Sequence, residues 1–319
     1  MRQGQTMKTE QLVKPFDGPI EEFPSMEQLP EGVTPIRLED TFGYDVDFRP
    51  GIVYAQRSSE VQHIHVLIPK DQKTPEKRYP LVVFIQGSAW HRQEVFQHLP
   101  HMIQVCQQGI AVALVEYRPS EVAPFPAQVQ DAKTAIRFMR KNAEQFHIDP
   151  DRIAVWGDSS GAHTAVMAGF TADAEPDTDL YAEVSSKVCC IVDWYGPMDI
   201  SRMNYVPSMQ DHIEPDSPEG YLIGQKNVLE NPDAVAPTIP MNYLSSDRET
   251  PPVLIMHGSR DQLVSFEQGC LLYNRLKALE KNVRMYKLEG AYHAFGGFNN
   301  PQAVQIVIDF LKEHLVKAR

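Results

Sequence analysis

From Tyr79 onward, short apolar runs alternate with longer stretches in which apolar residues recur every three or four positions. Continuous apolar runs are typical of parallel strands buried on both faces, and the longer periodicity is typical of amphipathic helices. The alternation therefore predicts an α/β fold, with a mostly parallel central sheet covered by helices on both faces. The strands predicted in this way are Leu81–Ile85, Ile110–Val115, Ile153–Trp156, Val188–Val192, Val253–Met256 and Val283–Leu288.

Two segments have a clear helical pattern. Between Val129 and Phe146 the apolar residues form one face, and the Asp149-Pro150 pair predicts where this helix ends. A last helix is predicted over residues 301–316, where Pro301 suits the first turn.

Ahead of these elements, two runs have strand character, Ile52–Ala55 and Val61–Leu67. A turn-like stretch at residues 56–59 separates them. The two runs are predicted to add an antiparallel edge to the parallel sheet.

Two further segments lack either pattern. Residues 1–45 hold five prolines among many acidic residues, which predicts an irregular N-terminal arm and leaves residues 46–319 as the folded domain. Residues 201–249 are rich in Pro, Asp, Met and Tyr and separate two predicted strands. Long irregular insertions are often functional, so we expect this segment to form a partial cap over the functional site.

Composition narrows the partners and the compartment. The 319 residues suffice for a sizeable core, and the formal net charge of -12 predicts a surface that repels nucleic acid and anionic membranes. The N-terminus lacks the apolar core of a signal peptide, although a trimmed signal peptide would leave the same sequence. The four cysteines have no metal-ligand spacing and indicate free thiols, so we expect a cytoplasmic protein without a metal site. The oligomeric state is left open, and a homodimer is compatible with the sequence.

One pentapeptide carries candidate chemistry. Gly157-Asp158-Ser159-Ser160-Gly161 follows an apolar run and precedes a helix-compatible stretch, which is the G-x-S-x-G pattern of a nucleophile elbow. Glycines on both sides of the serine allow close backbone packing, and the turn presents the hydroxyl above the sheet. The pattern predicts Ser159 as a nucleophile. A serine that caps a helix between two glycines is the alternative.

A nucleophilic serine needs a base, and the base needs a carboxylate to orient it and to stabilise its charge. Asp261 follows the predicted strand Val253–Met256, and His293 follows the next predicted strand. The order Ser159, Asp261, His293 is that of the α/β hydrolases, which favours these three as the catalytic residues. His257 is expected to order the loop before Asp261, and His163 to pack within its helix.

Acyl transfer also needs hydrogen-bond donors for the tetrahedral oxyanion. The backbone N–H of Ser160, directly after the nucleophile, is one predicted donor. The small-residue loop Gln86–Trp90 follows the strand Leu81–Ile85, and the amides of Ser88 and Ala89 are the other candidates.

Together these motifs resemble those of the α/β-hydrolase esterases of the hormone-sensitive-lipase-like and feruloyl and acetylxylan esterase (BD-FAE-like) type. The resemblance spans roughly residues 60–317 and implies an α/β-hydrolase fold that hydrolyses carboxylic esters through an acyl-enzyme without a cofactor. Gln86 stands where the family has histidine, and Ser88 where it has glycine. The segments that match the family motifs are Gln86–Trp90, Phe125–Ala132, Gly157–His163, His257–Asp261 and Tyr292–Phe295.

The substrate is less specified than the chemistry. Trp90, Trp194 and Tyr195 stand at the ends of two predicted strands and are candidates for a substrate-binding wall, with core packing as the alternative. The polar insertion lacks the apolar stripe of a lipase lid. We therefore expect a small-molecule or oligosaccharide ester, with a short acyl or hydroxycinnamoyl (feruloyl or acetyl) group on plant cell-wall carbohydrate.

Three other readings of the sequence stay open. A kynurenine-formamidase-like amidase would use the same three residues. A peptidase of the prolyl-oligopeptidase type would need a longer chain for its propeller domain. A non-catalytic receptor with a hydrolase fold would be expected to lose one of the three residues, and all three are present.

Overall fold

The computed structural model describes residues 15–19, 22–24, 30–35, 44–57, 60–71, 74, 76–178 and 180–315. The chain divides into two compact units, residues 1–42 and 43–319. Much of the N-terminal arm predicted for residues 1–45 lies outside the described residues. Within the first unit, the rings of Phe16 and Phe23 pack edge to face with centroids 5.4 Å apart.

The described part of the second unit forms one eight-stranded sheet with the order β1-β2-β4-β3-β5-β6-β7-β8. Strand β2 pairs antiparallel with β1 and β4, and the remaining pairs are parallel. The predicted mostly parallel sheet with an antiparallel edge is therefore confirmed. The strands are β1 (Asp45–Arg57), β2 (Glu60–Lys70), β3 (Tyr79–Ile85), β4 (Ala111–Val115), β5 (Ile148–Asp158), β6 (Ile191–Trp194), β7 (Val253–Gly258) and β8 (Val283–Leu288).

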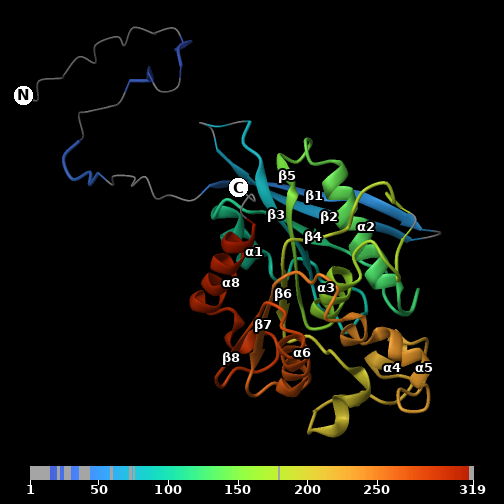
Figure 1. The fold of residues 1–319 in the computed structure, drawn as a ribbon. Helices are drawn as coiled ribbons and strands as arrows, with labels where there is room; N and C mark the ends of the chain where they lie inside the picture. The colour runs from blue at the N-terminus through green and yellow to red at the C-terminus, as the bar shows by residue number, and fades with distance from the viewer. Residues whose placement is uncertain are drawn as a thin grey trace, which may run out of the picture. The chain divides into compact units, whose positions relative to one another are not determined.

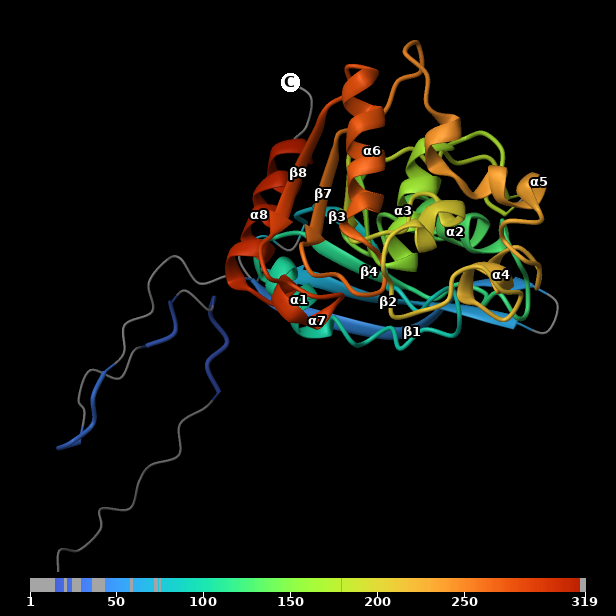
Figure 2. The same cartoon turned by 90° about the horizontal axis from the view of Figure 1, so that it is seen from below.

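Helices cover both faces of this sheet (Figures 1 and 2). The apolar faces of α2 (Ala127–Lys141), α3 (Ser160–Phe170) and α6 (Phe266–Ala278) share one buried cluster with the strands. The helices α1 (Leu99–Gln107) and α8 (Pro301–His314) share the other cluster. Two apolar layers thus enclose the central strands and hold their carboxyl ends in fixed positions.

Several predicted boundaries are wrong, and two of the differences have identifiable reasons. Helix α2 ends at Lys141, because Asn142 caps it with both its amide and its side chain on the carbonyl of Phe138. Phe146 is buried beyond the helix end, so its apolar character extended the pattern. The strand predicted over Val188–Val192 is displaced along the chain: β6 begins at Ile191 and runs on to Trp194 through Asp193, whose buried carboxyl group accepts the Gly196 amide at 2.9 Å.

The segment predicted as a cap consists of short helical turns joined by irregular chain. It contains α4 (Pro218–Leu222) and α5 (Pro232–Val235), which lie together in Figure 1, and 3₁₀ turns at Ile200–Tyr205, Ala236–Thr238 and Pro240–Tyr243. A small apolar cluster joins this segment to Trp90, and its other buried members are Ile200, Leu222, Ile223, Val228 and Val235.

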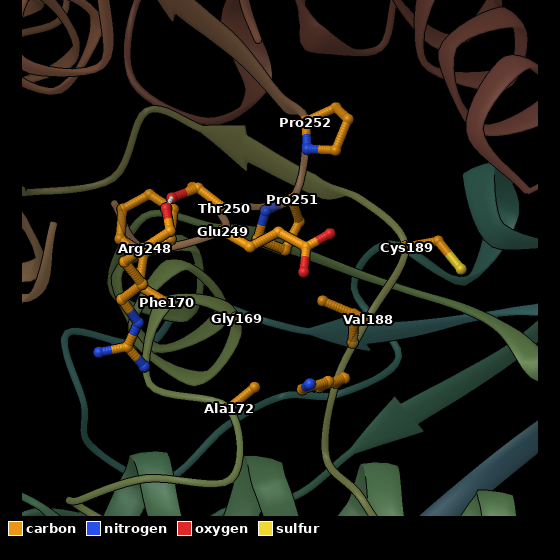
Figure 3. A pocket seen from close by; sticks show the side chains of 11 residues that line it. Gly169, Phe170, Ala172, Val188, Cys189, Arg248, Glu249, Thr250, Pro251 and Pro252 are labelled. Carbon is orange, nitrogen blue, oxygen red and sulfur yellow. Dashed lines mark hydrogen bonds between the residues drawn. The ribbon is translucent and has the colours of Figure 1, made fainter. Parts of the chain in front are cut away.

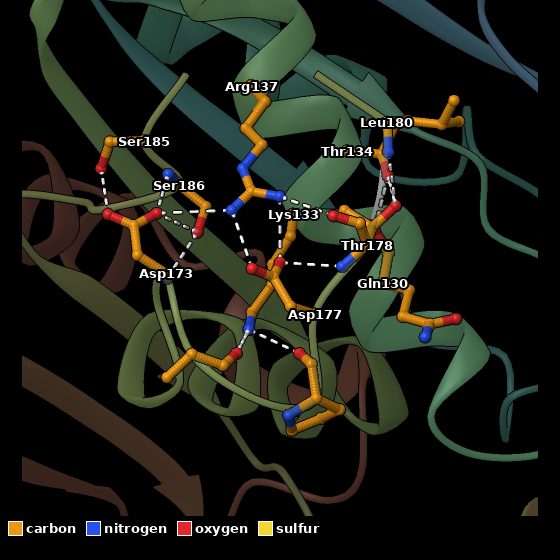
Figure 4. A network of polar contacts seen from close by, with 12 residues as sticks. Gln130, Lys133, Thr134, Arg137, Asp173, Asp177, Thr178, Leu180, Ser185 and Ser186 are labelled. Atoms are coloured by element: carbon orange, nitrogen blue, oxygen red, sulfur yellow. Dashed lines mark hydrogen bonds and ion pairs between the residues drawn. The ribbon is translucent and has the colours of Figure 1, made fainter. Parts of the chain in front are cut away.

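A polar network on α2 secures the connection that follows α3 (Figure 4). Lys133 is fully buried, and Arg137 binds the carboxylate of Asp177 with an N–O distance of 3.0 Å. The ammonium group of Lys133 donates three hydrogen bonds, and these replace the hydrogen bonds to water that are lost on burial. The acceptors are the backbone carbonyls of Thr171, Ala174 and Pro176, at 2.6–2.7 Å from Nζ.

All four cysteines are free thiols, as predicted. Within the described ranges, no helix has the length and apolar character needed to cross a membrane.

Candidate active site

Ser159 occupies a sharp turn between β5 and α3. Its backbone has φ 50° and ψ -129°, a region that residues other than glycine rarely adopt. A Cβ atom on Gly161 would lie 2.1 Å from the carbonyl oxygen of Ile85, and one on Gly157 would lie 2.2 Å from that of Gly161. Only glycine allows this approach of α3 to β3, so the spacing of the pentapeptide follows from backbone packing.

The structure brings Ser159, His293 and Asp261 into one hydrogen-bonded chain. The Oγ atom of Ser159 lies 3.0 Å from Nε2 of His293, and Nδ1 of the same ring lies 2.7 Å from Oδ2 of Asp261. Each residue follows the carboxyl end of a different strand, β5, β7 or β8. The predicted juxtaposition of the three side chains is therefore present.

Asp261 is held as a buried carboxylate. Burial alone would raise its pKa, but hydrogen bonds from His257 and His293 outweigh that effect and lower the pKa to about 2. Its second oxygen accepts the amides of Leu263 and Val264 at 3.0 and 2.9 Å. Because an ionised carboxylate only accepts hydrogen bonds, Nδ1 of His293 carries the proton and Nε2 is free to accept one.

His257 orders this loop, as the sequence predicts. Its ring is fully buried, and Nε2 lies 2.8 Å from the carbonyl oxygen of Val264 and 3.4 Å from Oδ2 of Asp261. Helix packing is only part of the role of His163, since its Nε2 also lies 2.7 Å from the carbonyl oxygen of Thr238 in the 201–249 segment.

Two of the three predicted substrate-binding aromatics are core residues. Trp194 and Tyr195 are fully buried, and Phe298 from α7 (Phe295–Phe298) packs against both rings. The Tyr195 ring also contacts the His293 ring, with centroids 4.8 Å apart. Both faces of the central strands are covered at this point, so neither side chain forms a substrate wall, and Tyr195 supports the base.

Trp90 does line the cavity beside Ser159, but it is 1% exposed. Its ring packs edge to face against His163, with centroids 5.3 Å apart. The side chain therefore fixes the wall of the site and offers little surface for stacking.

The predicted oxyanion donors divide into two groups. The amide of Ser88 donates to Oγ of Ser160 at 2.9 Å, so it is already engaged, and its assignment as a donor is corrected. Within the described ranges, no residue accepts a hydrogen bond from the Ala89 amide. Ser160 is the first residue of α3, where an amide has no acceptor inside its own helix. The amides of Ala89 and Ser160 thus remain available.

Sequence reasoning missed the side chains that hold the oxyanion loop. Asp158 accepts the Gly87 amide at 2.9 Å, and Ser88 Oγ lies 2.8 Å from the hydroxyl of Tyr117. Burial raises the pKa of Tyr117 to about 12, so the hydroxyl stays neutral. No motif marks Tyr117, because it reaches the loop only through the pairing of β4 with β3.

The partner of Gln86, at one of the two departures from the family pattern, is also visible. Its amide nitrogen donates to Oε1 of Gln97 at 2.8 Å. Gln93 binds the backbone of the loop on the other side, donating to the carbonyl of Gln86 at 2.9 Å and accepting the amide of Tyr117 at 2.8 Å. Glutamines therefore order this loop.

A cavity of about 200 Å³ adjoins Ser159 and His293. The oxyanion loop lines it on one side, and Gln210, His212 and Glu219 of the 201–249 segment line it on another. A cavity of about 400 Å³ lies at the amino ends of β6 and β7 instead, away from Ser159, between the end of α3 and residues 248–252 (Figure 3). The described residues contain no His, Cys, Asp and Glu cluster suited to a metal ion.

The sheet order and the elbow between β5 and α3 define the class: the protein has the α/β-hydrolase fold. The BD-FAE family model matches residues 64–276, and the chain belongs to this family. The resemblance inferred from the motifs is thereby confirmed.

Individual relatives carry esterase names. Esterase LipC of Mycobacterium tuberculosis (strain ATCC 25618 / H37Rv) is 29% identical over 258 residues, covering 77% of this chain and 61% of LipC. Esterase LipQ of the same strain is 26% identical over 243 residues, covering 74% of this chain and 56% of LipQ. This chain therefore spans less than two thirds of the length of either relative.

Solved structures with the same fold include proteins named for carbohydrate esters. A truncated carbohydrate esterase from gut microbiota is 30% identical with a TM-score of 0.74, covering 87% of this chain and 99% of that one. An acetyl ester-xyloside bifunctional hydrolase from Caldicellulosiruptor lactoaceticus has a TM-score of 0.68 at 22% identity, covering 82% and 95% of the two chains. At that identity the second likeness concerns the fold alone.

Proposed function

We propose that the protein is a serine carboxylic-ester hydrolase that acts through an acyl-enzyme on short-chain acyl or hydroxycinnamoyl esters of plant cell-wall carbohydrate. The observation that carries the proposal is the hydrogen-bonded chain from Ser159 through His293 to Asp261 at a strained elbow. Membership of the BD-FAE family and the esterase names of the relatives support it.

The hydrogen bonds indicate which step of the reaction each of the three residues performs. Ser159 Oγ attacks the ester carbonyl carbon while its proton passes to Nε2 of His293, and Asp261 stabilises the imidazolium that forms. The amides of Ala89 and Ser160 donate to the oxyanion of the tetrahedral intermediate. The intermediate collapses, the bond to the alcohol oxygen breaks, and the Nε2 proton passes to the leaving alkoxide.

Hydrolysis of the acyl-enzyme repeats these steps with water. His293 accepts a proton from the water as the water attacks the acyl carbon, and then returns that proton to Ser159 as the carboxylic acid leaves. These steps use side chains and amides of this chain and require no cofactor.

The size of the site favours a small acyl group. A cavity of about 200 Å³ is below the roughly 300–1,000 Å³ of sites for larger ligands. The buried Trp90 ring fixes one wall of the cavity. Acetyl esters therefore fit the proposal better than feruloyl esters, and long-chain esters fit it least.

The test is hydrolysis of a panel by the wild type and by Ser159→Ala. The panel contains p-nitrophenyl acetate, butyrate and decanoate, methyl ferulate, acetylated xylan and N-formylkynurenine. We expect acetate release from xylan, falling rates with longer acyl chains, and a loss of at least about 10⁴-fold in kcat for Ser159→Ala.

Ser245→Ala, at an exposed serine, is the matched control and should retain wild-type rates. Equal rates for Ser159→Ala and wild type would contradict the mechanism. Turnover of N-formylkynurenine and of no ester in the panel would show that the protein is an amidase and would contradict the proposed esterase activity.

A further inference from the structure

Two ionisable side chains of the 201–249 segment are buried beside the catalytic cavity and have no part in the mechanism above. His212 is 2% exposed and Glu219 is 3% exposed, and both line the cavity that Ser159 and His293 line. The Nδ1 atom of His212 lies 2.9 Å from Oε1 of Glu219. Buried charged groups normally need partners, so this pair requires an explanation.

The contact has the distance of an ion pair, and Nδ1 of His212 is buried without a hydrogen-bond partner among the described residues. The same holds for Oε2 of the Glu219 carboxylate. A carboxylate oxygen accepts hydrogen bonds, and leaving one unsatisfied in a buried site is unfavourable. A ligand that brings a hydrogen-bond donor to this oxygen therefore gains more than a ligand of the same shape without one.

Hydrogen bonds attach the 201–249 segment, which holds the pair, to the loop that carries Asp261. Nε2 of His212 lies 3.1 Å from the carbonyl oxygen of Leu263, and the amide of Met209 donates to the carbonyl of Gln262 at 2.8 Å. The side chain of Gln262 in turn accepts the amide of His293 at 3.1 Å. Since His293 delivers its proton to the leaving alkoxide, this attachment favours a position of the pair beside the alcohol half of the ester.

We propose that Glu219, positioned by His212, forms an alcohol-side subsite that accepts a hydrogen bond from a hydroxyl vicinal to the scissile ester. A partly acetylated sugar or another polyol monoester has such a hydroxyl, and a simple alkyl ester has none. This inference rests on the proposed ester hydrolysis and adds what selects the alcohol. A simple alkyl ester brings no donor to this buried acceptor and should therefore be a poorer substrate, because a buried polar group left without a partner is costly.

The experiment compares two esters that differ by one hydroxyl, trans-2-hydroxycyclohexyl acetate and cyclohexyl acetate. The acyl group is the same, so the ratio of their kcat/KM values isolates recognition of the alcohol. For the wild type we expect a ratio of at least about 10 in favour of the hydroxylated ester. Glu219→Gln places an amide at this position and should lower the ratio at least about fivefold, whereas Glu214→Gln, at an exposed glutamate of the same segment, should leave it unchanged.

His212→Asn is the second variant, and it serves also if Glu219→Gln does not fold. It removes the ring that orients the carboxylate and should lower the ratio as well. A merely structural role would reduce both kcat/KM values equally and leave the ratio intact, and that result would overturn the proposal. Dependence on Glu219 in the pair methyl ferulate and methyl cinnamate, without dependence in the cyclohexyl pair, would overturn the assignment to the alcohol.

A binding measurement separates this inference from the proposed function. Calorimetric titration of trans-2-hydroxycyclohexyl acetate into Ser159→Ala should show weaker binding once Glu219→Gln is added. If the wild type hydrolyses no ester but this difference is found, the proposed function fails and the subsite stands. If hydrolysis depends on Ser159 and neither the ratio nor the binding depends on Glu219, the subsite fails and the proposed function stands.

Discussion

Gly161→Ala tests whether the approach of α3 to β3 positions the oxyanion loop. The added Cβ would lie 2.1 Å from the carbonyl oxygen of Ile85 and 2.7 Å from the carbonyl carbon of Gln86. Real Cβ contacts essentially never fall below 3.0 Å, so the two segments must separate by about 1 Å. Gln86 leads directly into the loop that carries the Ala89 amide, so this separation moves the amide away from Ser159.

The magnitude follows from the geometry. A misplacement of about 1 Å lowers rates by up to roughly 10²-fold, and loss of one oxyanion donor lowers kcat by roughly 10²–10³-fold. We expect kcat for p-nitrophenyl acetate to fall about 100-fold, with KM within about threefold of wild type. Overpacking should also lower the free energy of unfolding by about 1–3 kcal/mol.

Gly169→Ala is the matched control, because Gly169 lies near the other end of the same helix. Its Cβ would meet the flexible end of the Ile191 side chain, at 2.4 Å, far from the oxyanion loop in sequence and at the opposite end of α3. This variant should lose stability and keep kcat within about threefold of wild type. The assay is steady-state kinetics together with thermal unfolding. A folded Gly161→Ala protein with near wild-type kcat, or an equal loss of kcat in Gly169→Ala, would refute the reasoning.

Three further predictions concern the base, the core and a buried lysine. Asp261→Asn should lower kcat by about 10⁴-fold while the fold persists, and unchanged ester turnover would contradict its role. Trp194→Phe should lower the free energy of unfolding by about 1–3 kcal/mol without changing KM, because the ring packs in the core; a large rise in KM would restore it as a substrate wall. Burial lowers the pKa of Lys133 from 10.5 to about 8, so the unfolded chain binds more protons than the folded protein between these pH values. The free energy of unfolding should therefore rise with pH across that window by up to about 3 kcal/mol. Lys133→Met should abolish this rise in denaturant titrations at about pH 7–10.5.

The catalytic side chains and the strands could be predicted from the sequence for one physical reason. In a parallel sheet the carboxyl ends of the strands meet at one edge, so a strand pattern followed by Ser159, Asp261 or His293 already fixes which side chains converge. Glycine spacing added the elbow, since the approach at Gly161 excludes any side chain. Neither inference depends on knowing which strands are neighbours.

Other details of the site depend on which segments are neighbours in the fold, and the sequence could not predict them. The Ser88 amide is occupied because Ser160 stands opposite it, a contact between residues 72 positions apart. For Trp194 and Tyr195, at the end of a strand, the sequence leaves a substrate wall and core packing as alternatives, and the contact with Phe298 decides for the core.

The pairing of His212 with Glu219 arises within irregular chain. No periodicity predicts which side chains of the 201–249 segment meet, because its short turns have no repeating face. The contacts that bring the segment to the cavity join residues distant in sequence: Met209 donates its amide to Gln262, and Nε2 of His212 lies 3.1 Å from the carbonyl oxygen of Leu263, in the loop that carries Asp261.

Covalent labelling with p-nitrophenyl diethyl phosphate tests the central claim most directly, because the reagent captures a serine activated by a neighbouring base. We expect one diethylphosphoryl group per chain, located on Ser159 by peptide mass spectrometry and accompanied by p-nitrophenol release and loss of ester hydrolysis in proportion. Ser159→Ala should take up no label, and Asp261→Asn should react far more slowly. A labelled protein that retains its esterase activity, or a label on another residue, would contradict the assignment of Ser159 as the nucleophile.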